Sequence, residues 1–243
     1  PNVETNKSSR KTYRVPVTGG TAEIITHPDS LLANKNISPD GKYLISNKEV
    51  KVKNILGSDY YPQLTKSNVY IFDNLAYRHW DTWEDGKFDH VFIAPTQNAK
   101  DEKDIMPNEP YDCPQKPFGG DEDYIWSPDS RQVIYVTKKK YGKDYAVSTN
   151  TDLYAYDVAT GITQNLTAEM KGYDLNPAYN KDGVLAWLSM ERDGYQADKQ
   201  DIVAMANSIK MNLTRFRDDL HVNSFAWSND GKFIYFIAAV NGT

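Results

Sequence analysis

The densest group of side chains that could take part in chemistry lies within eleven residues, from Tyr77 to Lys87. Two indoles, one guanidinium, one imidazole and three carboxylates occur there. The candidates for substrate binding are Arg78, His79, Trp80, Asp81, Trp83 and Glu84. Carboxylates beside aromatic rings favour a cationic or amine-bearing ligand, because ion pairing and cation–π attraction act together. The alternative interpretation is structural: the rings could simply seal this segment against the neighbouring sheet.

Elsewhere the sequence lacks the usual signatures of catalysis, so we expect no catalytic residue in this chain. There is no Gly-x-Ser-x-Gly nucleophile elbow, no phosphate loop and no glycine-rich dinucleotide turn. Cys113 has no histidine nearby that would activate its thiol. His79 and His90, with Asp81 and Asp89 between them, could form a metal site, but packed or solvated histidines are the more common case. We therefore expect neither a metal nor a cofactor.

Composition narrows the class of protein and its partners. The chain has 243 residues, of which 40% are apolar and 25% charged, as in a globular protein. Its net charge is −5 and no basic stripe interleaves with aromatic residues, so a nucleic-acid partner is not expected. No apolar stretch approaches the roughly 20 residues of a membrane span. The chain opens at Pro1 without a signal peptide, so the sequence itself does not identify the compartment.

A short phrase recurs along the chain and predicts its architecture. Its copies are Ser38-Pro39-Asp40-Gly41, Ser127-Pro128-Asp129-Ser130, Asn180-Lys181-Asp182-Gly183 and Ser228-Asn229-Asp230-Gly231. A β-branched or aromatic run follows each copy, which indicates a hairpin turn between two strands. The last two spacings between the aligned aspartates are 53 and 48 residues, close to one propeller blade of about 40–50 residues.

A second hairpin follows the first in each repeat. The paired segments are 152–157 with 162–167, 201–205 with 209–214, and 12–17 with 21–26. Two of these pairs end in the same tripeptide, Asn-Leu-Thr, at Asn165-Leu166-Thr167 and Asn212-Leu213-Thr214. The sequence therefore predicts an all-β fold, a β-propeller of four-stranded antiparallel blades, with no substantial helix.

The repeats divide residues 1–243 into about three whole blades and two half blades. The expected parts are 1–31 (outer strands of a first blade), 32–106 (a blade with an insertion at 47–87), 107–167, 168–213, and 214–243 (inner strands of a further blade). Open strand edges at both ends could pair between copies and form an oligomer.

These repeats resemble the propellers of the prolyl oligopeptidase superfamily and the tricorn and TolB propellers. The phrase Arg78-His79-Trp80-Asp81-Thr82-Trp83 is similar to the dipeptidyl-peptidase V and acylaminoacyl-peptidase type of these serine peptidases. In that branch such a segment lies in an N-terminal propeller that precedes an α/β-hydrolase domain. The hydrolase domain, with its serine, aspartate and histidine, is missing from this chain.

The resemblance implies a non-catalytic propeller that gates substrate entry to a serine exopeptidase. The missing hydrolase domain would release N-terminal dipeptides, and a propeller carboxylate would hold the free amine of the peptide substrate. A periplasmic or secreted location is also implied. The alternative is a TolB-like binding propeller that acts by protein–protein interaction without enzymatic activity. A nucleophile elbow encoded after Thr243 would favour the first, and a stop codon the second.

Overall fold

The computed structural model describes residues 12–14, 20–25, 36–66 and 68–241. They fall into two units, Pro1–Lys35 and Asn36–Thr243. In the first unit, strands β1 (Thr12–Arg14) and β2 (Glu23–Ile25) form a two-stranded antiparallel sheet. Residues 15–17 and 26 of the strands expected there lie outside the described residues.

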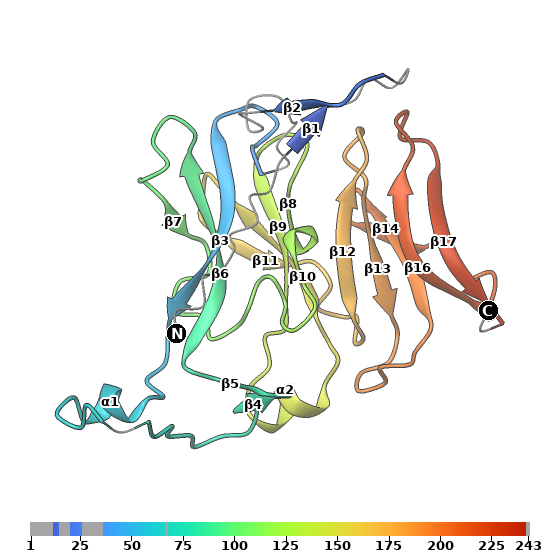
Figure 1. Cartoon of the computed structure of the whole chain (residues 1–243). Helices are drawn as coiled ribbons and strands as arrows, with labels where there is room; N and C mark the ends of the chain where they lie inside the picture. Colours follow the sequence, from blue (N-terminus) through green and yellow to red (C-terminus); the bar gives the residue numbers. More distant parts are fainter. Residues whose placement is uncertain (1–11, 15–19, 26–35, 67, 242–243) are drawn as a thin grey trace. The chain divides into compact units, whose positions relative to one another are not determined.

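The second unit contains two four-stranded antiparallel sheets in which consecutive strands are neighbours (Figure 1). The first sheet contains β8 (Tyr124–Trp126), β9 (Gln132–Thr137), β10 (Asp152–Asp157) and β11 (Thr163–Asn165). The second contains β12 (Asp174–Tyr179), β13 (Leu185–Met190), β14 (Gln200–Ala206) and β15 (Ile209–Asn212). This is the blade architecture that the repeat predicted, and the all-β fold class is confirmed.

Two further sheets flank these blades in sequence. One contains β3 (Tyr43–Lys51), β6 (Lys87–Pro95) and β7 (Lys103–Asp104), and the other β16 (Leu220–Trp227) and β17 (Ile234–Val240). The first of them has three strands where we expected four, and a single bridge from Ile37 to Leu44 takes the fourth position. Part of the segment expected to form that strand, residues 32–35, lies outside the described residues.

The recurring phrase forms the same turn each time. The hydroxyl of Ser38 donates to Asp40 at 2.7 Å, and the backbone N–H of Tyr43 donates back to Ser38 Oγ at 2.9 Å. The copies at Ser127 and Ser228 repeat both bonds, and Asn180 replaces the serine in the degraded copy. The residue after each aspartate has a positive φ, which explains the preference for glycine there.

The core lies between successive sheets rather than in a single centre. Val133 and Tyr135 of β9 pack against the β3–β6 sheet, whereas Ile134 and Val136 pack against the β12–β15 sheet. A third cluster joins β13 and β14 to β16, with Leu188 and Leu220 among its members. Because successive side chains of a strand point to opposite faces, a strand buried on both faces must be apolar throughout.

An insertion separates β3 from β6. We expected it at 47–87, but β3 and β6 stay paired as far as Lys51 and Lys87, so the insertion is 52–86. The polar residues 47–51 continue the ladder, with side chains that are largely exposed. The insertion contains α1 (Gly57–Tyr60), β4 (Arg78–His79) and β5 (Thr82–Trp83).

The remaining helical segments are short. They are a 3-10 turn at Asp121–Asp123 and helix α2 (Lys143–Val147). Within the described ranges, no helix has the length and apolar character needed to cross a bilayer.

Candidate functional site

Backbone hydrogen bonds between residues 52–53 and Gly86 close the base of the insertion, which we call the neck. Lys53 and Glu84 are the charged residues at this neck. The Gly86 carbonyl accepts hydrogen bonds from the backbone N–H groups of Val52 at 2.9 Å and Lys53 at 3.0 Å. Gly86 has a φ of +86°, and a Cβ there would lie 2.1 Å from the Lys53 carbonyl oxygen. Only glycine therefore allows residue 86 to approach the Lys53 backbone this closely.

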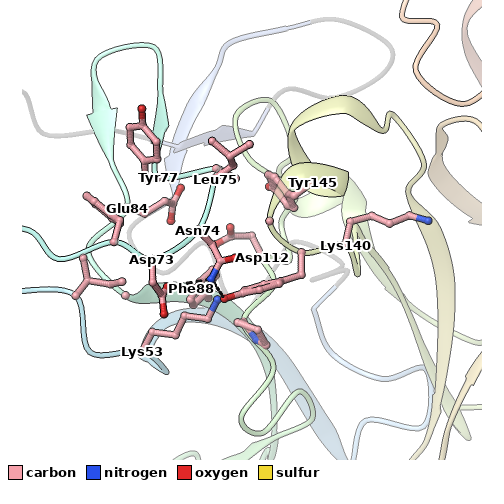
Figure 2. A pocket seen from close by; sticks show the side chains of 17 residues that line it. Lys53, Asp73, Asn74, Leu75, Tyr77, Glu84, Phe88, Asp112, Lys140 and Tyr145 are labelled. Carbon is pink, nitrogen blue, oxygen red and sulfur yellow. Dashed lines mark hydrogen bonds between the residues drawn. The ribbon is translucent and has the colours of Figure 1, made fainter.

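A pocket of about 90 Å³ lies beside the neck. Its walls come from both ends of the insertion and from segments 110–112 and 140–145 of the β8–β11 blade. Glu84, Asp112 and Lys53 contribute its charged side chains together with Asp73 and Lys140 (Figure 2). The aromatic wall consists of Phe72, Tyr77, Phe88, Tyr141 and Tyr145. The pocket can therefore hold a small charged group against aromatic rings.

Glu84 presents a free carboxylate to this pocket. Its backbone N–H donates to the Tyr77 carbonyl at 3.0 Å, which fixes the position of the residue. Burial raises the pKa of Glu84, and the nearby Asp112 raises it further, against opposing effects of Lys116 and Lys53. No hydrogen bond or ion pair links this carboxylate to another residue in the described part of the chain. It is a partly desolvated acceptor without a partner.

Asp112 differs because its charge is already compensated. The side chain is 5% exposed, and its Oδ1 accepts from the Asp89 backbone N–H at 2.9 Å and from Lys116 Nζ at 3.0 Å. Burial raises the pKa of Asp112, while Lys116 opposes that effect. Of the two carboxylates, Glu84 is therefore the one available to a ligand.

The aromatic wall already accommodates a cation. Lys53 Nζ lies 4.4 Å from the centre of the Tyr141 ring, and burial lowers the pKa of this lysine. The Tyr141 hydroxyl is held by Asn74 Nδ2 at 2.6 Å (Figure 2). A ring fixed in this way is suited to cation–π contact with an ammonium group.

The structure distributes the six predicted residues over three environments. Glu84 alone lines the pocket. Trp83 stacks with Phe72 and Tyr77, and the Arg78 guanidinium lies 5.2 Å from the centre of its indole. This packing supports the structural interpretation for Arg78 and Trp83.

The other three predicted residues lie at the exposed turn of the β4–β5 hairpin. Asp81 Oδ1 accepts a hydrogen bond from Thr82 Oγ1 at 3.5 Å, and the His79 ring lies against Trp80. Trp80 also contacts the ring of Phe118, with 5.5 Å between the centroids. The structure therefore does not bring Asp81 to the pocket.

The sequence missed the pocket residues outside the Tyr77–Lys87 segment. The most important are Lys53, Asp73, Asp112, Tyr141 and Tyr145. Asp112 lies in the proline-rich entry to its blade and Tyr141 in the segment expected as a hairpin tip. The sequence therefore marks each of them only as a loop residue. Loops commonly carry binding residues, which is the one signal that could have marked them.

The remaining titratable groups considered for chemistry have structural roles. His90 is buried, with Nδ1 2.8 Å from Asp104 Oδ2 and Nε2 2.8 Å from the Glu109 carbonyl. Burial raises the pKa of the Cys113 thiol well above its usual value, which disfavours the reactive thiolate. In the ranges that the structure describes, no three histidine, cysteine or acidic side chains group as metal ligands.

Solved structures similar to this chain include two TolB proteins. The protein from Agrobacterium tumefaciens is 16% identical with a TM-score of 0.47, and the match covers 96% of this chain and 64% of that one. The protein from Acinetobacter baumannii is 14% identical with a TM-score of 0.42, over 93% and 48% of the two chains. No protein-family model matches the chain.

Curated proteins similar in sequence include several dipeptidyl-peptidases 5. The one from Porphyromonas gingivalis is 41% identical over 208 residues, which are 83% of this chain and 30% of that protein. The one from Porphyromonas endodontalis is 39% identical over 164 residues, 66% of this chain and 23% of that protein. This chain is therefore similar in sequence to part of the dipeptidyl-peptidase 5 proteins and spans less than a third of their length.

Proposed function

We propose that this chain is the non-catalytic, substrate-gating propeller of a dipeptidyl-peptidase and that it holds the free amine of a short peptide. The observation that carries the proposal is the Glu84 carboxylate, which lines a small aromatic pocket and has no hydrogen-bond or ion-pair partner among the described residues. The sequence relationship to dipeptidyl-peptidase 5 proteins supports the same class of ligand.

Charge and size both favour an N-terminal amine as the ligand. An ammonium group would form a charge-assisted hydrogen bond with Glu84, worth about 1.5–3 kcal/mol. Aromatic walls add cation–π attraction, and Lys53 already shows this geometry on Tyr141. The pocket of about 90 Å³ excludes a folded chain but admits the end of a peptide. Substrate gating would follow because only chain ends reach the carboxylate.

The test is Glu84→Gln in the full-length peptidase, with Asp81→Asn as the matched control. Each change removes one negative charge from the same hairpin, but only Glu84 lines the pocket. Peptides with a free and an acetylated N-terminus are compared by kcat/KM. We expect the preference for the free amine to fall about tenfold or more in Glu84→Gln, because a hydrogen bond to a charged group is lost. Asp81→Asn should keep the wild-type preference.

Two results would contradict the proposal. One is a Glu84→Gln enzyme that distinguishes free from acetylated peptides as well as the wild type does. The other is an equal loss of preference in both variants, which would indicate a general effect of charge on the hairpin. Melting temperatures of the variants identify any loss that results from unfolding.

A further inference from the structure

We propose that Glu84 and Lys53 together bind a short zwitterion, a free α-amino acid or dipeptide whose two ends carry opposite charges. This inference rests on the proposed function, because it places the ammonium group of the ligand at Glu84. It adds a site for the carboxylate of the ligand at Lys53. Under the proposed function such a ligand is a product of the peptidase, since in a longer substrate the same carbonyl belongs to an uncharged amide.

Lys53 carries an ammonium group without a hydrogen-bond or ion-pair partner among the described residues. Burial lowers the pKa of this lysine, and the charges of Asp73 and Glu84 oppose that effect. Its Nζ lies 4.4 Å from the centre of the Tyr141 ring and 5.7 Å from that of Phe88, so aromatic rings surround it. A carboxylate would give this partly desolvated ammonium a charge-assisted hydrogen bond.

Glu84 and Lys53 influence each other across the pocket without forming a pair. Burial raises the pKa of Glu84 and lowers that of Lys53, and in each case the charge of the other residue opposes the shift. The neck holds both residues, since the Lys53 backbone N–H donates to the Gly86 carbonyl at 3.0 Å, two residues after Glu84. Two opposite, unpaired charges in one pocket are complementary to a ligand that carries both charges.

The other charged side chains of the pocket are less suited to these two roles. Asp112 is already paired with a lysine at 3.0 Å. Asp73 is exposed and accepts a hydrogen bond from the neighbouring asparagine at 3.0 Å. The Nζ of Lys140 points away from the other labelled side chains (Figure 2). Glu84 and Lys53 are therefore the acid and the base that remain available to one ligand.

Size and spacing limit the ligand to a short zwitterion. The pocket of about 90 Å³ compares with about 30 Å³ for one water molecule in the liquid, so it has no room for a length of chain. At about 3.3 Å per extended residue, the two charged ends of a dipeptide lie roughly 7 Å apart and those of a tetrapeptide roughly 13 Å apart. The longer separation takes the carboxylate out of the pocket.

The test measures binding to the full chain by isothermal titration calorimetry. The probes are alanine, Ala-Ala, Ala-Ala-amide, N-acetyl-Ala-Ala and tetra-alanine. The variants are Lys53→Met and Glu84→Gln, with Lys66→Met as the control, because Lys66 belongs to the same insertion but does not line the pocket. We expect the wild type to bind Ala-Ala about tenfold or more tightly than Ala-Ala-amide, because the amide loses a hydrogen bond between charged groups. Tetra-alanine should bind as weakly as the amide, and alanine against Ala-Ala distinguishes the two zwitterions.

The variants should separate the two ends of the ligand. Lys53→Met should lose the preference for the free carboxylate and keep that for the free amine, and Glu84→Gln should show the reverse. Lys66→Met should keep both preferences. Because each preference is a ratio of affinities within one variant, a partly unfolded fraction changes neither.

The outcomes also separate this inference from the proposed function. If the wild type binds Ala-Ala and Ala-Ala-amide equally, or tetra-alanine as tightly as Ala-Ala, the zwitterion site is wrong while the amine site stands. A Lys53→Met variant that still prefers the free carboxylate would overturn the role of Lys53. If the wild type binds Ala-Ala and N-acetyl-Ala-Ala equally, the amine site is wrong and the zwitterion site falls with it.

Discussion

At the scale of single residues, the role of a carboxylate depends on what already compensates its charge. Glu84 and Asp112 line one pocket, and burial raises the pKa of both. Asp112 is bonded to Lys116 and to the Asp89 backbone, so it stabilises the loop. Among the residues that the structure describes, Glu84 has no such partner, so its carboxylate is available to a ligand.

The raised pKa of Glu84 predicts a pH dependence of amine binding. Only the ionised carboxylate attracts an ammonium group, so binding should weaken as the pH falls through the pKa of Glu84, which burial raises above its ordinary value. The measurement is Kd for a free-amine peptide between pH 4 and pH 8. We expect a loss of about tenfold on the acid side, which disappears in Glu84→Gln. A wild-type Kd that is constant over this range would contradict the role of Glu84.

At the scale of elements, the backbone hydrogen bonds at the neck of the insertion hold two segments that line the pocket. Gly86 joins the end of the insertion to Val52 and Lys53, and the β3–β6 ladder begins directly beyond it. The hairpin that carries Glu84 and the strand end that carries Lys53 are therefore fixed relative to each other by backbone bonds.

Gly86→Ala should destabilise the protein and weaken amine binding together. The positive φ alone costs about 1–2 kcal/mol for a residue with a Cβ, and the contact with the Lys53 carbonyl adds strain. Gly183→Ala is the control, because its φ is +82° but nothing lies within 4 Å of its Cβ. Urea denaturation should show a larger loss for Gly86→Ala than for Gly183→Ala. Equal losses would mean that the neck tolerates a side chain.

At the scale of the whole molecule, two aspartates of the described core are buried, and burial favours their protonated form. Burial raises the pKa of Asp123 and of Asp174 to about 7. Asp174 accepts a hydrogen bond from Trp187 Nε1 at 2.9 Å, inside the β12–β15 blade. An unfolded aspartate titrates near pH 3.9, so the folded state binds more protons between about pH 4 and pH 7.

These two aspartates should lower the free energy of unfolding as the pH rises from about 4 to about 7. Other acidic groups act in the opposite direction, so the comparison is with Asp174→Asn, which keeps an acceptor for Trp187. We expect the variant to gain stability relative to the wild type as the pH rises through this range. Urea denaturation at pH 5 and pH 7.5 measures the difference. A difference that stays constant between the two values would show that Asp174 does not titrate there.

The sheets could be predicted from the sequence because each hairpin turn is stabilised by hydrogen bonds between residues that are close in the chain. Each Ser-x-Asp-Gly turn bonds within a few residues of itself, as at Ser38 and Asp40, so the pattern is visible in the chain. The pocket brings together side chains that no local pattern links, such as Lys53, Glu84 and Tyr145. Trp83 and Glu84 are neighbours in sequence, yet Trp83 stacks on Phe72 and Tyr77 of the aromatic wall, and only Glu84 lines the pocket itself.

The pairing of Lys51 with Lys87 makes the insertion a separable module. Residues 52–86 leave and re-enter the sheet at directly opposed positions, where a short turn would also join the strands. None of the three core clusters contains a residue from this range. Insertion residues that line the pocket can therefore change while the three core clusters keep their members. Under the proposed function, the specificity for peptides would change through this module.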